Sequence, residues 1–265
     1  MDYDLSPIIE GWDYDPEEII VRMITGRDGV AKLQMRLDLG LIQMEIDGRP
    51  DGRHPHGFAS LLDYHEARAE QARADSRPFQ LSDEECVRLQ QEALQYYYRY
   101  TGLFQLGDYR RVCRDADRNL RALDFVSQHA EDPSLIGAFQ QYRPYILMMA
   151  ARAKAHLAIE EGDHGSAIGH LAAAIRCIEE FYAGQGRLDL LPSCPEIQFL
   201  QEWRLELEEN TPLSPREKLR REMEAAVARE EYELAARLRD RIKRLAEEGP
   251  RRSRRRPRQE SSSGG

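Results

Sequence analysis

The chain has 265 residues, of which 41% are hydrophobic and 32% are charged, with a formal net charge of −9. This composition is typical of a soluble protein, and no run approaches the roughly 18 apolar residues that a membrane-spanning helix needs. The charge is uneven, because residues 214–265 carry +6 and the first 213 residues carry −15, and so acidic a body does not favour nucleic-acid binding.

Residues 1–57 are predicted to form a small β module that ends in a turn-rich loop. The run Ile19 to Thr25 reaches turn residues at 26–29, and residues 32–39 then alternate as in a β hairpin. The apolar residues change to even positions after Gly40, which indicates a bulge or a tight turn into a third strand. A helix from Pro16 to Ile24 is the alternative, because Asp-Pro-Glu-Glu also suits a helix start.

The loop Asp47–Gly57 is dense in turn residues and is the most site-like loop of the sequence. Its basic side chains would form an anion pocket or a partner contact, whereas a rigid connector between the β module and the helices is the simpler interpretation. The nearby carboxylates are accounted for as polar positions of a half-exposed sheet. The basic side chains are those of Arg49, Arg53, His54 and His56, and the carboxylates are those of Asp38, Glu45, Asp47 and Asp51. The two histidines lack further ligands at suitable spacing, so no metal site is predicted.

Residues 58–210 are predicted to form a helical body. Helix-start signals such as Ser82-Asp-Glu-Glu85 and breaks at Gly-Asp pairs set the expected boundaries. Pro144 is expected to kink or restart one helix. The predicted helices cover residues 58–75, 81–106, 109–129, 134–161, 164–183 and 195–209.

Two helix pairs in this body carry the same turn signal, Gly107-Asp108-Tyr109 and Gly162-Asp163-His164. The residues that follow resemble the turn and second helix of tetratricopeptide-type repeats, in which helix pairs stack into a solenoid. The two copies lie 55 residues apart rather than the usual 34 or so, and three repeats are normally needed. The expected fold class is therefore mainly α, with tetratricopeptide-like helical hairpins between an N-terminal β hairpin module and a C-terminal helical hairpin.

The densest aromatic cluster contains Tyr96, Tyr97, Tyr98 and Tyr100 around Arg99. These rings would either stack on single-stranded bases or line a peptide groove. They cannot all face one way on one helix, and the body is acidic, so we expect core packing plus a peptide surface.

Residues 214–248 are predicted to form two amphipathic helices in an antiparallel hairpin. Ser214, Pro215 and Glu217 give a strong helix-start signal, and the apolar pattern breaks near Arg229 to Glu231. Arginine and lysine residues occupy the solvent side of the second helix. The apolar and small positions are Leu219, Met223, Ala226, Val227, Tyr232, Ala235, Ala236, Leu238, Ile242 and Leu245.

These positions resemble the UVR motif shared by the bacterial excision-repair proteins UvrB and UvrC, which also occurs in activators of protein arginine kinases and in Clp-associated proteins. In that family the hairpin is a contact module that pairs with a second copy on another chain and carries no chemistry. The resemblance implies that these ten positions, together with Arg239, bind a protein partner, either another UVR-motif protein or the chain itself. Docking of the hairpin on its own helical body is the alternative.

The sequence lacks the chemical sites that often accompany this motif. It has no Gly-x4-Gly-Lys-Ser/Thr phosphate loop, which excludes the nucleotide-driven helicase activity of the UvrB type. The four cysteines, Cys86, Cys113, Cys177 and Cys194, form no Cys-x-x-Cys pair, which argues against a zinc ribbon or a redox dithiol and fits a reducing cytoplasm. The N-terminus does not resemble a secretion signal. We therefore predict no catalytic residues, no metal and no cofactor.

Residues 249–265 are predicted to form a disordered basic tail whose arginines would contact phosphates without sequence preference, or would only solubilise the chain. These arginines are Arg251, Arg252, Arg254, Arg255, Arg256 and Arg258. The expected function is that of a non-enzymatic adaptor linked to excision repair or to protein quality control. The alternative is a DNA-associated repair factor that binds through the tail, and an enzyme built on the Asp47–Gly57 loop is the least supported reading.

Overall fold

A computed structural model describes residues 4–210, residues 219, 222, 223, 226, 227 and 229, and residues 231–247 of the chain. The chain divides into two compact units, Met1–Glu208 and Glu209–Gly265. Within the described ranges, no helix is both long and apolar enough to cross a membrane.

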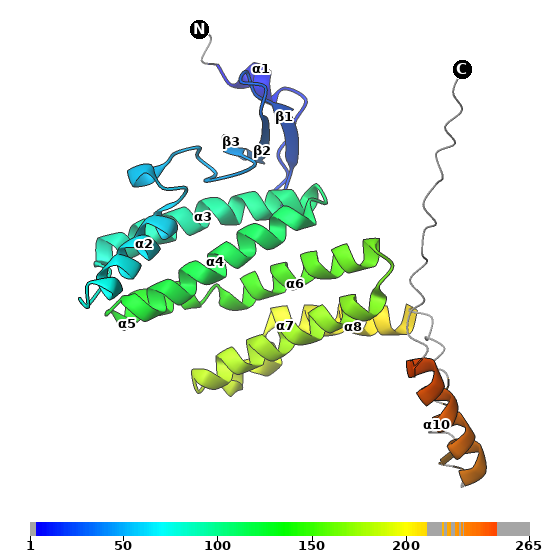
Figure 1. Cartoon of the computed structure of the whole chain (residues 1–265). Helices are drawn as coiled ribbons and strands as arrows, with labels where there is room; N and C mark the ends of the chain where they lie inside the picture. Colours follow the sequence, from blue (N-terminus) through cyan, green and yellow to red (C-terminus); the bar gives the residue numbers. More distant parts are fainter. Residues whose placement is uncertain are drawn as a thin grey trace, which may run out of the picture. The chain divides into compact units, whose positions relative to one another are not determined.

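The first unit begins with a short helix, α1 (Ser6–Ile9), and an antiparallel sheet (Figure 1). The strands are β1 (Val21–Thr25), β2 (Ala31–Leu37) and β3 (Gly40–Glu45), in the order β1-β2-β3. Gly40 pairs with Leu37, so β3 follows β2 after a two-residue turn, as the change of phase at Gly40 indicated. The alternative helix over residues 16–24 is wrong, because that stretch forms a turn followed by β1.

Strand β2 is buried on both faces. Leu33 and Met35 pack against helix α3 (Asp83–Gln105) at Gly102, where an added Cβ would lie 2.8 Å from Leu33. On the other face Gln34 accepts a hydrogen bond from Arg22 at 2.8 Å and is itself buried. The alternation of apolar and polar residues therefore marks the face that meets the helices, while hydrogen bonding satisfies the opposite face.

Helices form the rest of the first unit, and their ends follow local signals. Ser82 and Glu85 form the predicted capping box at the start of α3. The helix predicted over residues 134–161 is two helices, because the chain restarts at Arg143 with Pro144 in the first turn, where proline is tolerated. The remaining elements are α2 (Leu61–Ala74), α4 (Tyr109–His129), α5 (Pro133–Gln140), α6 (Arg143–Glu160), α7 (His164–Gly184) and α8 (Pro195–Asn210), with 3-10 turns η1 (Pro55–Gly57) and η2 (Leu188–Ser193).

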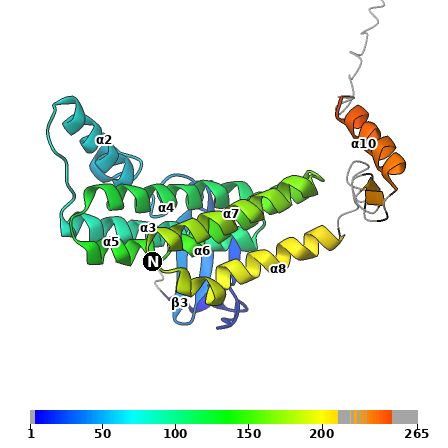
Figure 2. The same ribbon diagram turned by 90° about the horizontal axis from the view of Figure 1, so that it is seen from below.

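Helices α3, α4, α6 and α7 pack in that order, α3 on α4, α4 on α6 and α6 on α7 (Figures 1 and 2). The predicted turn repeat has the same geometry in both copies. Gly107 and Gly162 each have φ of 75°, and Asp108 and Asp163 each cap the next helix by accepting a backbone N–H three residues ahead. A positive φ at these two positions is easily adopted only by glycine, so one turn sequence produces both helix pairs.

Alanines on α6 allow its neighbours to approach from two sides. Ala151, Ala153, Ala155 and Ala158 are all buried, and α6 contacts both α4 and α7. Small side chains at a helix crossing shorten the distance between axes, so α6 forms the centre of the helical unit.

Candidate interaction surfaces

The C-terminal hairpin has a small apolar core of its own. Leu219, Ala226, Ala235 and Leu238 are buried against one another, with Met223 and Ile242 partly buried beside them. Residues 219, 222, 223, 226 and 227 are helical, and helix α10 (Tyr232–Glu247) follows after a reversal at which Glu231 donates its N–H to the carbonyl oxygen of Ala226 at 2.8 Å. The small residues Ala226 and Ala235 are buried at this contact, where small side chains allow two helices to approach closely.

Near its turn the hairpin leaves apolar side chains in solvent. Tyr232 is 67% exposed, Val227 is 50% exposed and Leu234 is 45% exposed. A hollow beside α10 is lined by Glu231, Tyr232, Glu233, Leu234 and Arg237. Of the predicted partner-binding residues, the hairpin therefore exposes Val227 and Tyr232, while Leu219, Ala226, Ala235 and Leu238 pack inside it.

The other predicted contact residues differ in how far they are described. Arg239 is exposed beside Asp240, and Ala236 is partly buried. Leu245 lies in α10, but its side chain is outside the described set. The start signal at Ser214, Pro215 and Glu217 also lies outside the described residues. So do the tail arginines, which are Arg251, Arg252, Arg254, Arg255, Arg256 and Arg258.

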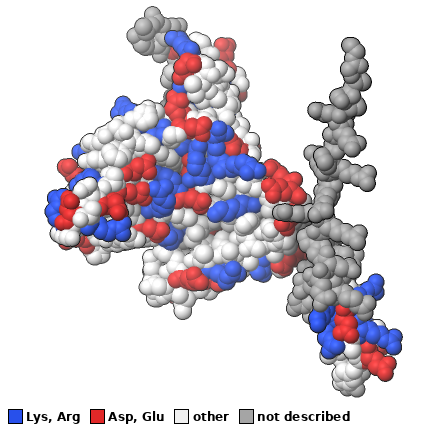
Figure 3. All heavy atoms as spheres, viewed as in Figure 1, with Lys and Arg blue, Asp and Glu red and all other residues white. Residues whose placement is uncertain are grey.

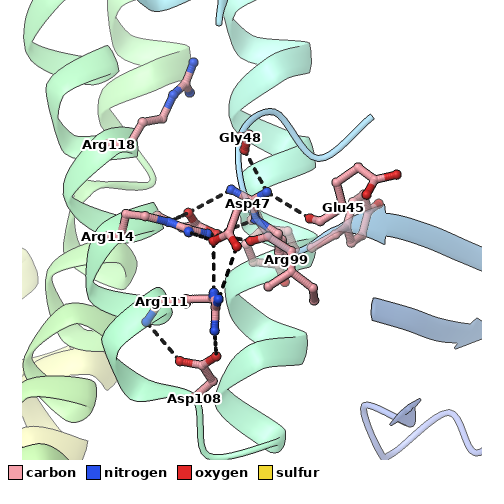
Figure 4. A network of polar contacts seen from close by, with 12 residues as sticks. Glu45, Asp47, Gly48, Arg99, Asp108, Arg111, Arg114 and Arg118 are labelled. Atoms are coloured by element: carbon pink, nitrogen blue, oxygen red, sulfur yellow. Dashed lines mark hydrogen bonds and ion pairs between the residues drawn. The ribbon is translucent and has the colours of Figure 1, made fainter. Parts of the chain in front are cut away.

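The Asp47–Gly57 loop is fixed to the helical unit by arginines of α3 and α4 (Figure 4). The carboxylate of Asp47 accepts hydrogen bonds from Arg111 at 3.0 and 3.2 Å and from Arg114. Arg99 binds both carboxylate oxygens of Asp115 at 2.6 and 2.9 Å, and its remaining nitrogen donates to the backbone oxygens of Glu45 and Gly48. Arg99 and Asp115 are both buried, and this ion pair connects the sheet to helices α3 and α4.

A second buried carboxylate contacts both the loop and the start of α2. Glu92 is fully buried on α3, accepts the backbone N–H of Leu61 at 2.7 Å, and forms ion pairs with Arg118 and Arg49. Its charge lies at the N-terminus of α2, where the helix dipole favours a negative group. These contacts anchor the loop to α3 and α4 through Arg49 and Asp47.

The four basic side chains of this loop do not act together on an anion. Arg49 pairs with Glu92 and Asp51, and His56 stacks on Tyr64 with 4.1 Å between ring centroids. Arg53 and His54 are exposed. The nearby carboxylates also have separate partners, since Glu45 pairs with Lys32 and Asp47 with the α4 arginines.

The arginines along α4 are balanced by acidic groups. Figure 3 shows basic and acidic side chains side by side across the middle of the helical unit. Arg110 lies 3.7 Å from Glu161, and Arg121 lies 2.6 Å from Glu66. Arginines that are already paired release few counterions on binding a phosphate backbone. The arginines along α4 therefore give little support to direct DNA binding.

Replacing Asp47 with asparagine is expected to alter the acid stability of the protein. Hydrogen bonds from Arg111 lower the pKa of Asp47 from 3.8 to about 2, against the opposing effect of burial. A carboxyl whose pKa is lower in the folded state stabilises the fold above its unfolded pKa, and that stabilisation disappears as the pH falls from about 4 to about 2. Asp47 is 66% exposed, so we expect a loss below about 1 kcal/mol at pH 7.

Urea unfolding at pH 7, 4 and 2.5 tests this expectation. The difference between wild type and Asp47→Asn is expected to shrink toward the lowest pH, and also in high salt, because salt screens an exposed ion pair. An equal difference at all three pH values would contradict the assigned role of the charge.

The tyrosine cluster divides between two environments. Tyr96 is buried beside the guanidinium groups of Arg118 and Arg99, with 4.2 and 4.9 Å to its ring centroid. Tyr97 and Tyr100 instead line a cavity between α3, α4, α5, α6 and the start of α8, together with Tyr142 and Tyr145. Sequence reasoning missed these last two tyrosines, because their closeness to α3 depends on how the helices pack.

Comparison with known proteins identifies one segment. The family model described as the UvrB/uvrC motif, UVR, matches residues 215–248. No curated protein and no solved structure matches the chain, so the likeness to tetratricopeptide repeats remains a prediction. The chain therefore contains a UVR motif, which is linked to excision repair and to contacts between proteins, and α10 lies within it.

Proposed function

We propose that this protein is a non-enzymatic adaptor whose UVR hairpin holds a protein partner. The observation that carries the proposal is the exposure of Val227, Tyr232 and Leu234 on a hairpin that has a core of its own. A single hydrophobic side chain in solvent is ordinary, but three close to the turn of one small unit favour an interaction site. Aromatic residues such as Tyr232 are also enriched among the residues that dominate binding energies.

The partner that fits this surface is another UVR-type hairpin, on a different protein or on a second copy of this chain. Among the described residues of the hairpin four are buried in its core, and so short a hairpin gains little free energy against the entropy of ordering about 30 residues. Pairing with a second hairpin would cover the exposed side chains and stabilise both. The motif connects such a partner with excision repair, and protein quality control is the other setting we propose.

A double substitution of Tyr232 and Leu234 by alanine tests the adaptor role. Wild type, this variant and the control Leu188→Ala are immobilised at equal density, and the proteins recovered from a cell lysate are quantified by mass spectrometry. At least one protein is expected to fall by about tenfold or more with the double variant, as for loss of a binding hot spot. Leu188 is 58% exposed on the other unit, so its substitution is expected to change nothing.

Two further measurements separate the alternatives. Sedimentation of the same three proteins shows whether the partner is a second copy, because only the double variant is then expected to lose its dimer. Fluorescence anisotropy with single- and double-stranded DNA tests the repair factor that binds through the arginine tail. Equal recovery with all three proteins, together with salt-dependent DNA binding, would replace the adaptor proposal with that alternative.

A further inference from the structure

The helical unit contains a cavity of about 600 Å³, which we name the tyrosine cavity. Its floor is made by fully packed side chains such as Tyr100, Leu123 and Phe139, so it is bounded by the core and not by a mobile loop. Its rim carries Leu94 and Tyr142, which are 48% and 52% exposed. A cavity of this volume is in the range of ligand sites, and its apolar rim is open to solvent.

Three tyrosines from two helices are in contact along one wall. Tyr97 meets Tyr100 edge-on at 5.6 Å and Tyr145 at 6.0 Å between ring centroids. Burial raises the pKa of Tyr100, and raises that of Tyr145 to about 12, so both phenols keep their protons at neutral pH. The wall therefore presents flat apolar rings that also carry O–H groups.

Besides the tyrosine hydroxyls, the polar side chains that line the tyrosine cavity are amides and a single carboxylate. Gln90 is half-buried and Gln91 is exposed, and neither side chain forms a hydrogen bond with any residue that the structure describes, which leaves their amides available to an occupant. Glu196, at the start of α8, is the one charged residue of the lining. It accepts a hydrogen bond from the Cys194 thiol at 3.2 Å, and within the described ranges it has no cationic partner.

This lining distinguishes among possible occupants. Phosphates and nucleic acids need cationic groups, and the cavity offers none. A helix satisfies its own backbone hydrogen bonds and would leave the free amides unused. An extended segment in the polyproline conformation has unpaired backbone groups that amides can bind, and aromatic grooves are the surfaces that accept its proline rings.

We propose that the tyrosine cavity binds an extended, proline-containing segment of a partner protein, with a lysine or arginine of that segment at Glu196. The negative charge of the first 213 residues, −15, also favours a basic segment over an acidic one. This contact would give the proposed adaptor a second surface for binding a partner. Only this biological role rests on the proposed adaptor function. Its chemistry is independent of the UVR hairpin.

Selection from a phage library of random 12-residue peptides tests the proposal on the full-length chain, with Tyr142→Ala used for counter-selection. The peptides enriched on wild type are expected to contain proline and at least one lysine or arginine. The consensus peptide, labelled and measured by fluorescence anisotropy, is expected to bind Tyr142→Ala about tenfold more weakly. Glu196→Gln is expected to remove the preference for this peptide over its version with glutamine at the basic position.

Controls separate a binding effect from a folding effect. Tyr142 and Leu94 are rim residues, so Tyr142→Ala and Leu94→Ala are each expected to weaken the peptide while thermal unfolding stays unchanged. Leu188→Ala is expected to bind like wild type, and so is the double variant of Tyr232 and Leu234, which keeps this test separate from that of the hairpin. The proposal is overturned by no enrichment over counter-selection, by enrichment of acidic peptides, or by proline-free peptides with apolar residues at helical spacing.

Discussion

Replacing Arg99 with alanine is expected to lower the free energy of unfolding of the first unit by about 3–5 kcal/mol, the range for breaking a buried ion pair from one side. The reason is that Asp115 would keep its charge in the interior without the two hydrogen bonds from Arg99. The backbone oxygens of Glu45 and Gly48 would lose their donor at the same time. The sheet would then lose its main polar connection to α3.

Urea denaturation followed by circular dichroism measures this loss. Arg110→Ala is the matched control, because Arg110 is an exposed arginine whose nearest carboxylate lies 3.7 Å away, and such pairs contribute about 0–1 kcal/mol. A double variant, Arg99→Met with Asp115→Leu, is expected to recover much of the stability, since it removes both buried charges together. A change below about 1 kcal/mol in Arg99→Ala would show that Asp115 does not depend on Arg99, and that Arg114, which donates to it at 2.8 Å, or water stabilises its charge instead.

The sheet and the helix boundaries could be predicted because their signals are local. The capping box at Ser82 and Glu85, the Gly-Asp turns and the change of phase at Gly40 each act within a few residues of chain. Such signals determine hydrogen bonds that close within one turn, so a single sequence is sufficient to place them. The break before α6 was harder, because proline permits either a kink or a new start.

The polar interior could not be predicted because its partners are distant in the chain. Glu92 lies on α3, yet it caps α2 through Leu61 and pairs with Arg118 of α4. Arg99 stands among tyrosines in the sequence, and nothing near it indicates the oxygen of Glu45, 54 residues away. Burial of charged groups depends on the final packing of helices, and residue patterns assign charges to the surface by default.

The UVR hairpin lies between these two cases. Its helices and its turn could be predicted, but its apolar positions divide between buried and exposed side chains. Leu219, Ala226, Ala235 and Leu238 are buried, whereas Val227 and Tyr232 are exposed. Tyr232 lies three residues before Ala235 on α10, so helical spacing places them on neighbouring positions and the sequence alone does not assign core and contact residues.

Substituting Leu238 by aspartate is expected to unfold the hairpin and leave the first unit intact. Leu238 is one of the four buried core residues among those described in the hairpin, and helices of about 16 residues are marginal without packing. Amide hydrogen exchange in residues 231–247 is therefore expected to accelerate by roughly tenfold or more, while α3, α4, α6 and α7 keep their protection because they belong to a separate unit. Binding of the partner should be lost with the hairpin.

Leu234→Asp is the matched control, because it places the same charge four residues earlier in α10, on a side chain that is 45% exposed. It is expected to weaken partner binding without accelerating exchange, since an exposed position does not contribute to the core. The two variants therefore separate folding of the hairpin from contact by its surface. If Leu234→Asp accelerated exchange as much as Leu238→Asp, the assignment of Leu234 as an exposed contact residue would be wrong. If Leu234→Asp left partner binding unchanged, the partner would bind elsewhere on the chain.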